Sequence, residues 1–87
     1  MRCLVVVARV LVADDDAEVR NLVRRVLQAQ GHDVIDAHDG AEALRLLETM
    51  PCDLVVADVY MGDVDGMELL VRIQQRGLRV PVLAVSG

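Results

Sequence analysis

Leu-Val-Val-Ala-Asp, residues 54–58, decides the fold, because four apolar residues in succession end in a carboxylate. A second stretch of the same form comes earlier, where the apolar run Val10–Ala13 is followed by Asp14, Asp15 and Asp16. Apolar runs without polar alternation are typical of strands buried on both faces of a parallel sheet. Because ligands of open α/β sheets bind beyond the carboxyl ends of the strands, we expect these carboxylates to share one pocket.

Carboxylates that are held together repel one another unless a cation joins them or one of them takes up a proton. Hard divalent cations such as Mg²⁺ prefer oxygen ligands. The two strand ends therefore predict a small acidic site for such a cation, with one carboxylate left to react.

The rest of the chain alternates between strand and helix patterns. Strands are expected near residues 9–13, 34–37, 54–57 and 80–85, and helices over residues 41–49, 66–75 and a first stretch that ends at Gly31. Either Asp15 or Asp16 can cap that first helix. The order β-α-β-α-β-α-β, with right-handed crossovers, predicts a parallel sheet with helices on both faces.

Helical spacing identifies the apolar side chains of each helix. The arginines of the first helix are expected to form a solvated face, and His32 and His38 are expected at the surface. The apolar positions of the three helices are, in order, Val19, Leu22, Val23, Val26 and Leu27; Ala43, Leu44 and Leu47, which should point inward; and Met67, Leu70, Val71 and Ile73.

Composition limits the classes of function. The 87 residues suffice for one small domain, 54% of them are hydrophobic, and the net charge is -5. The sequence contains no basic stripe of the kind that binds nucleic acid, and none of its apolar stretches is long enough to span a membrane. Cys3 and Cys52 lack metal-ligand spacing, which predicts reduced thiols in a cytoplasmic protein. We expect residues 1–8 to be an N-terminal extension, because their apolar core is short for a signal peptide.

Four segments, taken together and in order, resemble the receiver domain of two-component response regulators. They are residues 14–16, 39–44, 58–61 with 65–70, and 80–87. The resemblance covers residues 9–87 and implies a flavodoxin-like, doubly wound parallel sheet with strand order 2-1-3-4. It also implies a truncated, partial receiver domain that lacks the family's fourth helix, fifth strand and fifth helix.

The resemblance assigns a role to each site residue. Asp58 matches the phosphoacceptor and is also expected to bind Mg²⁺. Asp14 and Asp15 match the acidic pair that holds Mg²⁺, and the backbone carbonyl of Tyr60 matches a further metal ligand. Ser86 matches the hydroxyl that moves toward the phosphoryl group on activation. The implied function is a phosphorelay signalling module, not an enzyme, in the cytoplasm. Its implied partner is a sensor histidine kinase or phosphotransfer protein.

Two departures from the family pattern keep other functions open. Gly62 stands where the family usually has a proline, and the chain has no Lys to fill the role of the family's essential lysine. We therefore expect weak phosphorylation, with a degenerate, non-phosphorylated interaction module or inactive receiver fragment as the alternative. A magnesium-dependent phosphatase is disfavoured, because Tyr60 stands where that class has a second acid. An exposed fourth strand and an uncovered sheet face would favour self-association.

Overall fold

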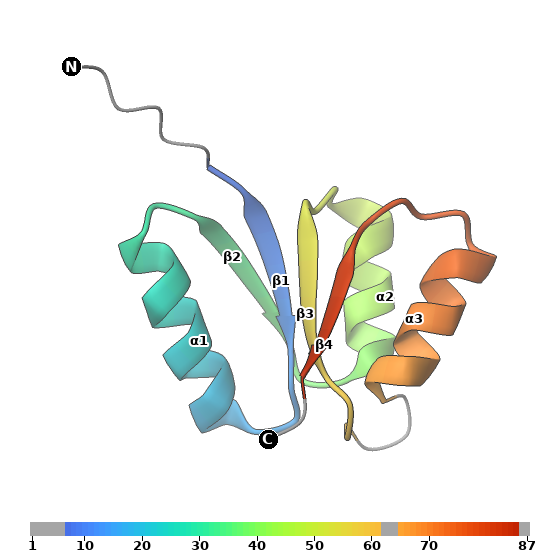
Figure 1. The fold of residues 1–87 in the computed structure, drawn as a ribbon, viewed down its shortest axis with the longest axis horizontal. Helices are drawn as coiled ribbons and strands as arrows, with labels where there is room; N and C mark the ends of the chain where they lie inside the picture. Colours follow the sequence, from blue (N-terminus) through green and yellow to red (C-terminus); the bar gives the residue numbers. More distant parts are fainter. Residues whose placement is uncertain (1–6, 62–64, 86–87) are drawn as a thin grey trace.

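The structure is a computed structural model that describes residues 7–61 and 65–85. Its described part is a four-stranded parallel sheet with three helices (Figure 1). The strand order is β2-β1-β3-β4, which confirms the expected order 2-1-3-4. In sequence order the elements are β1 (Arg9–Ala13), α1 (Ala17–Ala29), β2 (Asp33–Ala37), α2 (Gly40–Thr49), β3 (Leu54–Asp58), α3 (Gly66–Gln75) and β4 (Val82–Val85).

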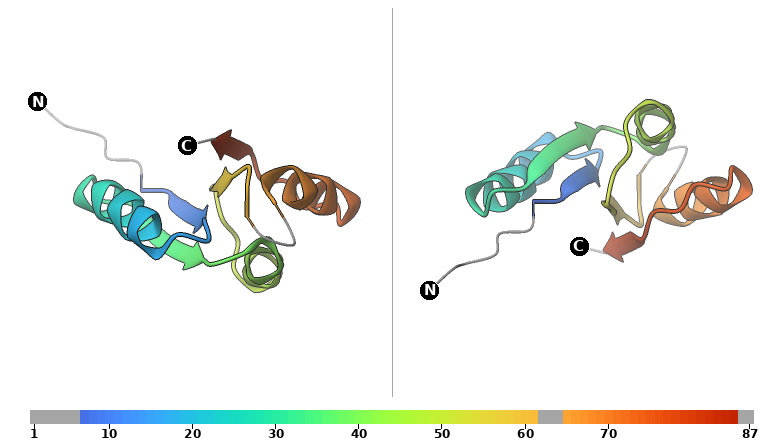
Figure 2. Two further views of the ribbon diagram at one scale, coloured as in Figure 1. Left: turned by 90° about the horizontal axis from the view of Figure 1, so that it is seen from below. Right: turned by 90° about the horizontal axis from the view of Figure 1, so that it is seen from above.

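The helices form layers on both faces of the sheet, with α1 on one side and α2 and α3 on the other (Figure 2). Successive side chains of a strand point to opposite faces, so β1 contributes to two separate cores. Leu11 packs in the larger core beneath α2 and α3, and Val10 and Val12 pack in the smaller one beneath α1. The central strands β1 and β3 are thereby fixed from both sides.

Each helix is capped by the aspartate that precedes its first residue. Asp16 accepts a hydrogen bond from the amide of Glu18 at 2.9 Å, and Asp39 and Asp65 each accept one at 2.8 Å from the glutamate three residues later. Such caps satisfy amide groups that have no partner inside the helix. Of the three consecutive aspartates after β1, the third is therefore the helix cap.

The fourth strand is shorter than expected, because it begins at Val82 rather than Val80. Pro81 has no N–H group to donate to the ladder. Its carbonyl still accepts a hydrogen bond from the amide of Val55 at 3.0 Å. The pairing with β3 therefore begins one residue before the regular strand does.

Helix α1 is less buried than its apolar pattern suggests. None of its residues is fully buried, and Leu22 is 62% exposed. Val23 and Leu27 face the smaller core, whereas Val19 and Val26 are exposed. The cause is the position of α1, which packs on β2 and β1 but makes few contacts farther along the sheet.

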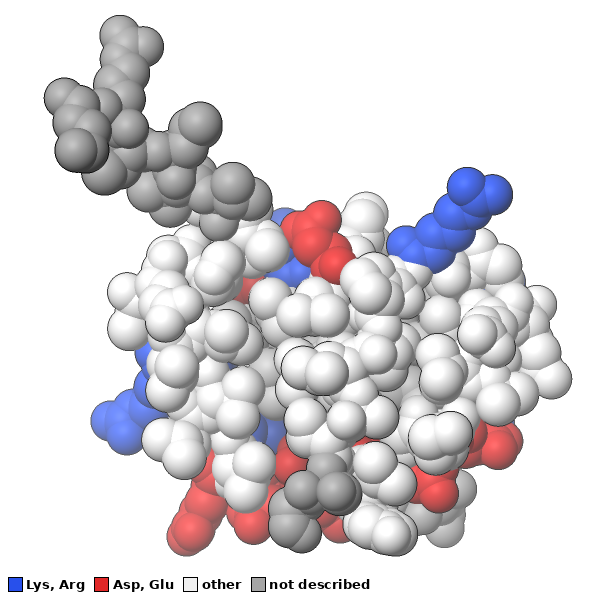
Figure 3. All heavy atoms as spheres, in the orientation of Figure 1, with Lys and Arg blue, Asp and Glu red and all other residues white. Residues whose placement is uncertain are grey.

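β4 is an edge strand in the described sheet, as the sequence predicted. Leu83 is 54% exposed, and Val85 is exposed on the same face. In Figure 3 the centre of the face that carries β4 consists mainly of residues other than Lys, Arg, Asp and Glu. Among the described helices, none has both the length and the apolar character needed to cross a membrane.

Candidate functional site

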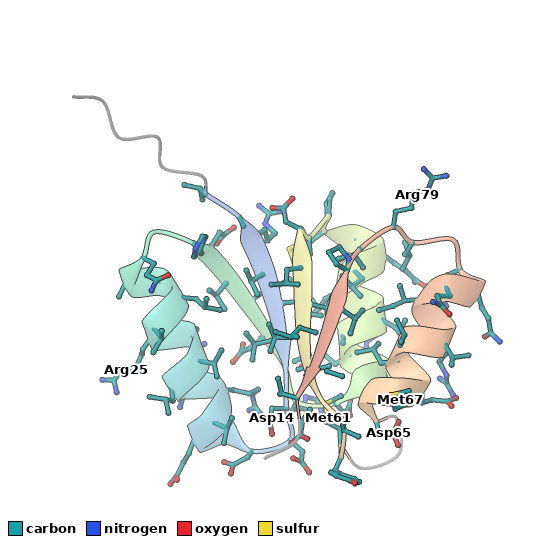
Figure 4. The ribbon with its side chains drawn as sticks, in the orientation of Figure 1. Asp14, Arg25, Met61, Asp65, Met67 and Arg79 are labelled. Atoms are coloured by element: carbon teal, nitrogen blue, oxygen red, sulfur yellow. The ribbon has the colours of Figure 1, made fainter. Side chains whose placement is uncertain are left out.

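The acidic residues meet because β1 and β3 are direct neighbours in the sheet. Ala13 pairs with Ala57, so that the residues that follow, Asp14 and Asp58, emerge side by side. Asp14, Asp15 and Asp58 each offer a carboxylate oxygen, and these oxygens lie within 4.8 Å of one another. Asp14 lies at the lower edge of the sheet in Figure 4. The structure thus brings together three of the predicted site residues.

Backbone amides orient two of the three carboxylates. Asp14 Oδ1 accepts a hydrogen bond from the amide of Asp16 at 2.9 Å, and Asp58 Oδ1 accepts one from the amide of Tyr60 at 3.0 Å. The amide of Asp14 donates to the carbonyl of Ala37 on β2 at 3.1 Å. Both carboxylates are therefore held by the turns that follow their own strands.

The charge of the pocket is only partly relieved by these contacts. Asp14 is 6% exposed, and this burial raises the pKa of its carboxyl group above the ordinary value. The hydrogen bond from Asp16 lowers that pKa, while the negative charges of Asp58 and Asp15 raise it. A divalent cation would remove this repulsion, and three close carboxylates are an oxygen donor set that suits Mg²⁺.

The other two predicted site residues, Tyr60 and Ser86, are not part of this carboxylate cluster. Tyr60 lies in the turn after β3, and the residue is 74% exposed, so any role in the pocket falls to its backbone. Ser86 lies outside the described residues. The assignment of its hydroxyl therefore stays a prediction.

The described residues also form a hollow away from this pocket. A cavity of about 330 Å³ lies at the opposite edge of the sheet, between the segments that lead into β3 and β4. Pro51, Cys52 and Val80 are among its lining residues. Cys52 is a free, half-buried thiol whose pKa is raised by burial.

Sequence reasoning missed two charged residues next to the pocket. Arg20 was expected on a solvated face, but only 18% of its side chain is exposed. It lies near Asp36 of β2, a residue for which no role was predicted. The position of Asp36 between apolar residues of the strand expected over residues 34–37 was the available signal, because a half-buried carboxylate needs a partner.

Comparison with known proteins identifies the family. Residues 10–87 match the model of the response regulator receiver domain, and the chain belongs to that family. It is a signalling module of two-component systems. Receiver domains in general have a histidine kinase as partner.

The relatives show how much of a longer protein the chain resembles. It is 40% identical over 79 residues to the transcriptional regulatory protein TrcR of Mycobacterium tuberculosis and 38% identical to the alkaline phosphatase synthesis regulator PhoP of Bacillus subtilis. Those matches cover 91% of this chain but only 31% and 33% of the relatives. The chain thus spans about a third of these proteins.

Solved structures confirm the fold. The receiver domain of the Francisella response regulator 1452 superimposes with a TM-score of 0.87 at 35% identity, over 91% of this chain and 65% of that one. The response regulator TrrA of Thermotoga maritima, solved in complex with Mg²⁺ and BeF, superimposes with a TM-score of 0.85 at 29% identity, over 91% of this chain and 69% of that one.

Proposed function

We propose that the chain is a phosphoacceptor module that takes a phosphoryl group from a histidine kinase or phosphotransfer protein onto Asp58. The observation that carries the proposal is the convergence of Asp14, Asp15 and Asp58 at two adjacent strand ends. Asp58 is the reactive member, because it lies beside an exposed turn, whereas Asp14 is buried. Asp14, Asp15 and Asp58, with the backbone carbonyl of Tyr60, would hold Mg²⁺.

The reaction is a transfer between two nucleophiles. A carboxylate oxygen of Asp58 bonds to phosphorus as the bond from phosphorus to the donor imidazole nitrogen breaks, and the imidazole takes up a proton. The product is an acyl phosphate. Bound Mg²⁺ would supply positive charge that offsets the repulsion between the carboxylate and the phosphoryl oxygens.

The residues around Asp58 prepare it for this reaction. The amide of Tyr60 fixes one oxygen of the carboxylate, so the side chain loses less freedom when it reacts. We propose that the Ser86 hydroxyl donates a hydrogen bond to the product. The 87-residue chain has no lysine to add a positive charge. Losing one preorganised contact of this kind costs on the order of 3 kcal/mol in the transition state, so we expect slow phosphorylation.

Acetyl phosphate with Mg²⁺ tests the proposal, with the mass of the intact protein followed over time. We expect wild type to gain one phosphoryl group slowly and to lose it in hydroxylamine, which cleaves acyl phosphates. Asp58→Asn should gain none. Asp53→Asn, which changes the acid just before the start of the same strand, should react like wild type. No gain in wild type would favour the non-phosphorylated interaction module instead, and a gain in Asp58→Asn would move the nucleophile elsewhere.

A further inference from the structure

Arg20 joins the acidic pocket to the neighbouring strand β2. Its Nη1 donates a hydrogen bond to the backbone carbonyl of Asp14 at 2.6 Å, and its Nε lies 3.6 Å from Oδ2 of Asp36. Arg24, one turn later on α1, also reaches Oδ2 of Asp36, at 3.3 Å. The half-buried Asp36 therefore anchors two arginines, but only Arg20 also has a hydrogen bond to the strand end that carries the pocket.

The carbonyl that Arg20 binds belongs to the peptide unit between Asp14 and Asp15. Peptide units are planar, so fixing the oxygen of one residue also fixes the nitrogen of the next. The amide of Asp14 is already fixed by the carbonyl of Ala37. With both of its flanking peptides held, Asp14 has little backbone freedom, and the direction in which the Asp15 side chain leaves the chain is set.

The guanidinium group suits this task better than an ammonium group would. It offers several donors in a rigid plane, so one side chain can bind a carbonyl oxygen and lie against a carboxylate at once. The low exposure of Arg20 limits competition from water for both contacts. Its own helix starts at the cap Asp16, so the same turn that orients Asp14 through the Asp16 amide also places Arg20.

We propose that Arg20, held by Asp36, is a positioning residue of the acidic pocket. It clamps the peptide between Asp14 and Asp15 so that both carboxylates face Asp58 before any ion binds. The inference rests on the proposed Mg²⁺ site, which Arg20 and Asp36 would support without touching the metal. Groups that orient metal ligands without touching the metal commonly change metal affinity by about 10–100-fold when they are removed.

Magnesium titrations followed by amide chemical shifts test the proposal. Arg20→Met keeps the length of the side chain and removes the clamp, so we expect its Mg²⁺ affinity to fall at least about tenfold. Arg24→Met is the matched control, because Arg24 shares Asp36 but has no described hydrogen bond to Asp14. Since Arg24 does not orient a metal ligand, the Mg²⁺ affinity of this variant should stay within about twofold of wild type. Asp36→Asn should give an intermediate loss and serves if Arg20→Met does not fold.

Two further measurements separate positioning from charge and from the proposed function. Arg20→Lys keeps the charge but loses the planar fork, so full recovery of affinity in this variant would overturn the proposal. Without Mg²⁺, hydrogen exchange at the Asp16 amide, which donates to Asp14 Oδ1, should accelerate in Arg20→Met and not in Arg24→Met. Equal exchange in both would overturn the clamp even if Mg²⁺ binds. If wild type shows no Mg²⁺ shifts at Asp14, Asp15 and Asp58, the proposed function fails, and the exchange rates alone still decide whether the clamp exists.

Discussion

Gly66 lies directly against the backbone of Asp58. A Cβ atom added at Gly66 would lie 2.6 Å from the carbonyl oxygen of Asp58, a separation that side-chain carbons do not tolerate. The amide of Gly66 also donates to the carbonyl of Val59 at 3.2 Å. The first turn of α3 and the end of β3 are thus in contact through backbone atoms alone, which only glycine permits here.

Gly66→Ala should therefore disturb both stability and the acidic pocket. Overpacking of this kind costs about 1–3 kcal/mol, or several degrees in Tm for a chain of this size. Because the atom that must move belongs to Asp58, we also expect weaker Mg²⁺ binding. Gly31→Ala is the control: its added Cβ meets no atom within 4 Å, but its φ of 89° strains alanine. It should lower Tm without altering Mg²⁺ affinity, and a Gly66→Ala variant with normal affinity would contradict the argument.

Asp58→Asn should raise the stability of the metal-free protein. The Asp58 charge helps to hold the pKa of Asp14 above its unfolded-state value, so stability falls as pH rises from the unfolded-state pKa through the raised folded-state pKa. Removing that charge reduces the electrostatic repulsion of Asp14 in the folded state at neutral pH. Thermal melts with and without Mg²⁺ should show a higher Tm for the metal-free variant and stabilisation by Mg²⁺ in wild type only. Asp33→Asn, which removes the same charge at the far end of β2, should keep the Mg²⁺ effect.

Glu42 should contribute to the acid limb of the stability curve. Its pKa is lowered, chiefly because its carboxylate accepts a hydrogen bond from the backbone amide of His38 at 2.9 Å. The contribution is therefore present above the ordinary pKa of glutamate and is lost as pH falls through the lowered value. Glu42→Gln should flatten this limb in urea melts recorded at successive pH values. Glu68→Gln, at the same position in α3, should change it less, and an unchanged curve in Glu42→Gln would count against the hydrogen bond.

The 87-residue chain should self-associate through β4. An edge strand leaves backbone groups available for pairing, and Leu83 adds exposed apolar surface beside it. Sedimentation should show a mass that rises with protein concentration in wild type, and Leu83→Lys should reduce the effect. Met67→Lys is the control, because Met67 is also 54% exposed but lies on α3. A wild type that stays monomeric at all concentrations would show that the edge is protected.

The sequence alone predicted the framework and the carboxylates well, for a local reason. An apolar run with Asp58 at its end specifies a buried strand and a polar strand end together, and the cap at Asp16 lies next to its helix in sequence. Leu69, which is fully buried, was not among the apolar positions expected for its helix, and Arg20 was placed in solvent. Burial on a helix depends on which strand lies beneath it and how far the sheet extends, and one-dimensional spacing does not contain that information.

The pairing of β1 with β3 also has a kinetic consequence. Ala13 and Ala57 are adjacent in the sheet, but two helices and a strand lie between them in the chain. Contacts between such distant segments are expected to form late, because the chain loses the entropy of closing the long loop before the strand pairing stabilises it. A chain emerging from the ribosome would carry Asp14 and Asp15 long before Asp58 arrives. Binding of the proposed metal would therefore report the docking of β3 against β1 rather than helix formation.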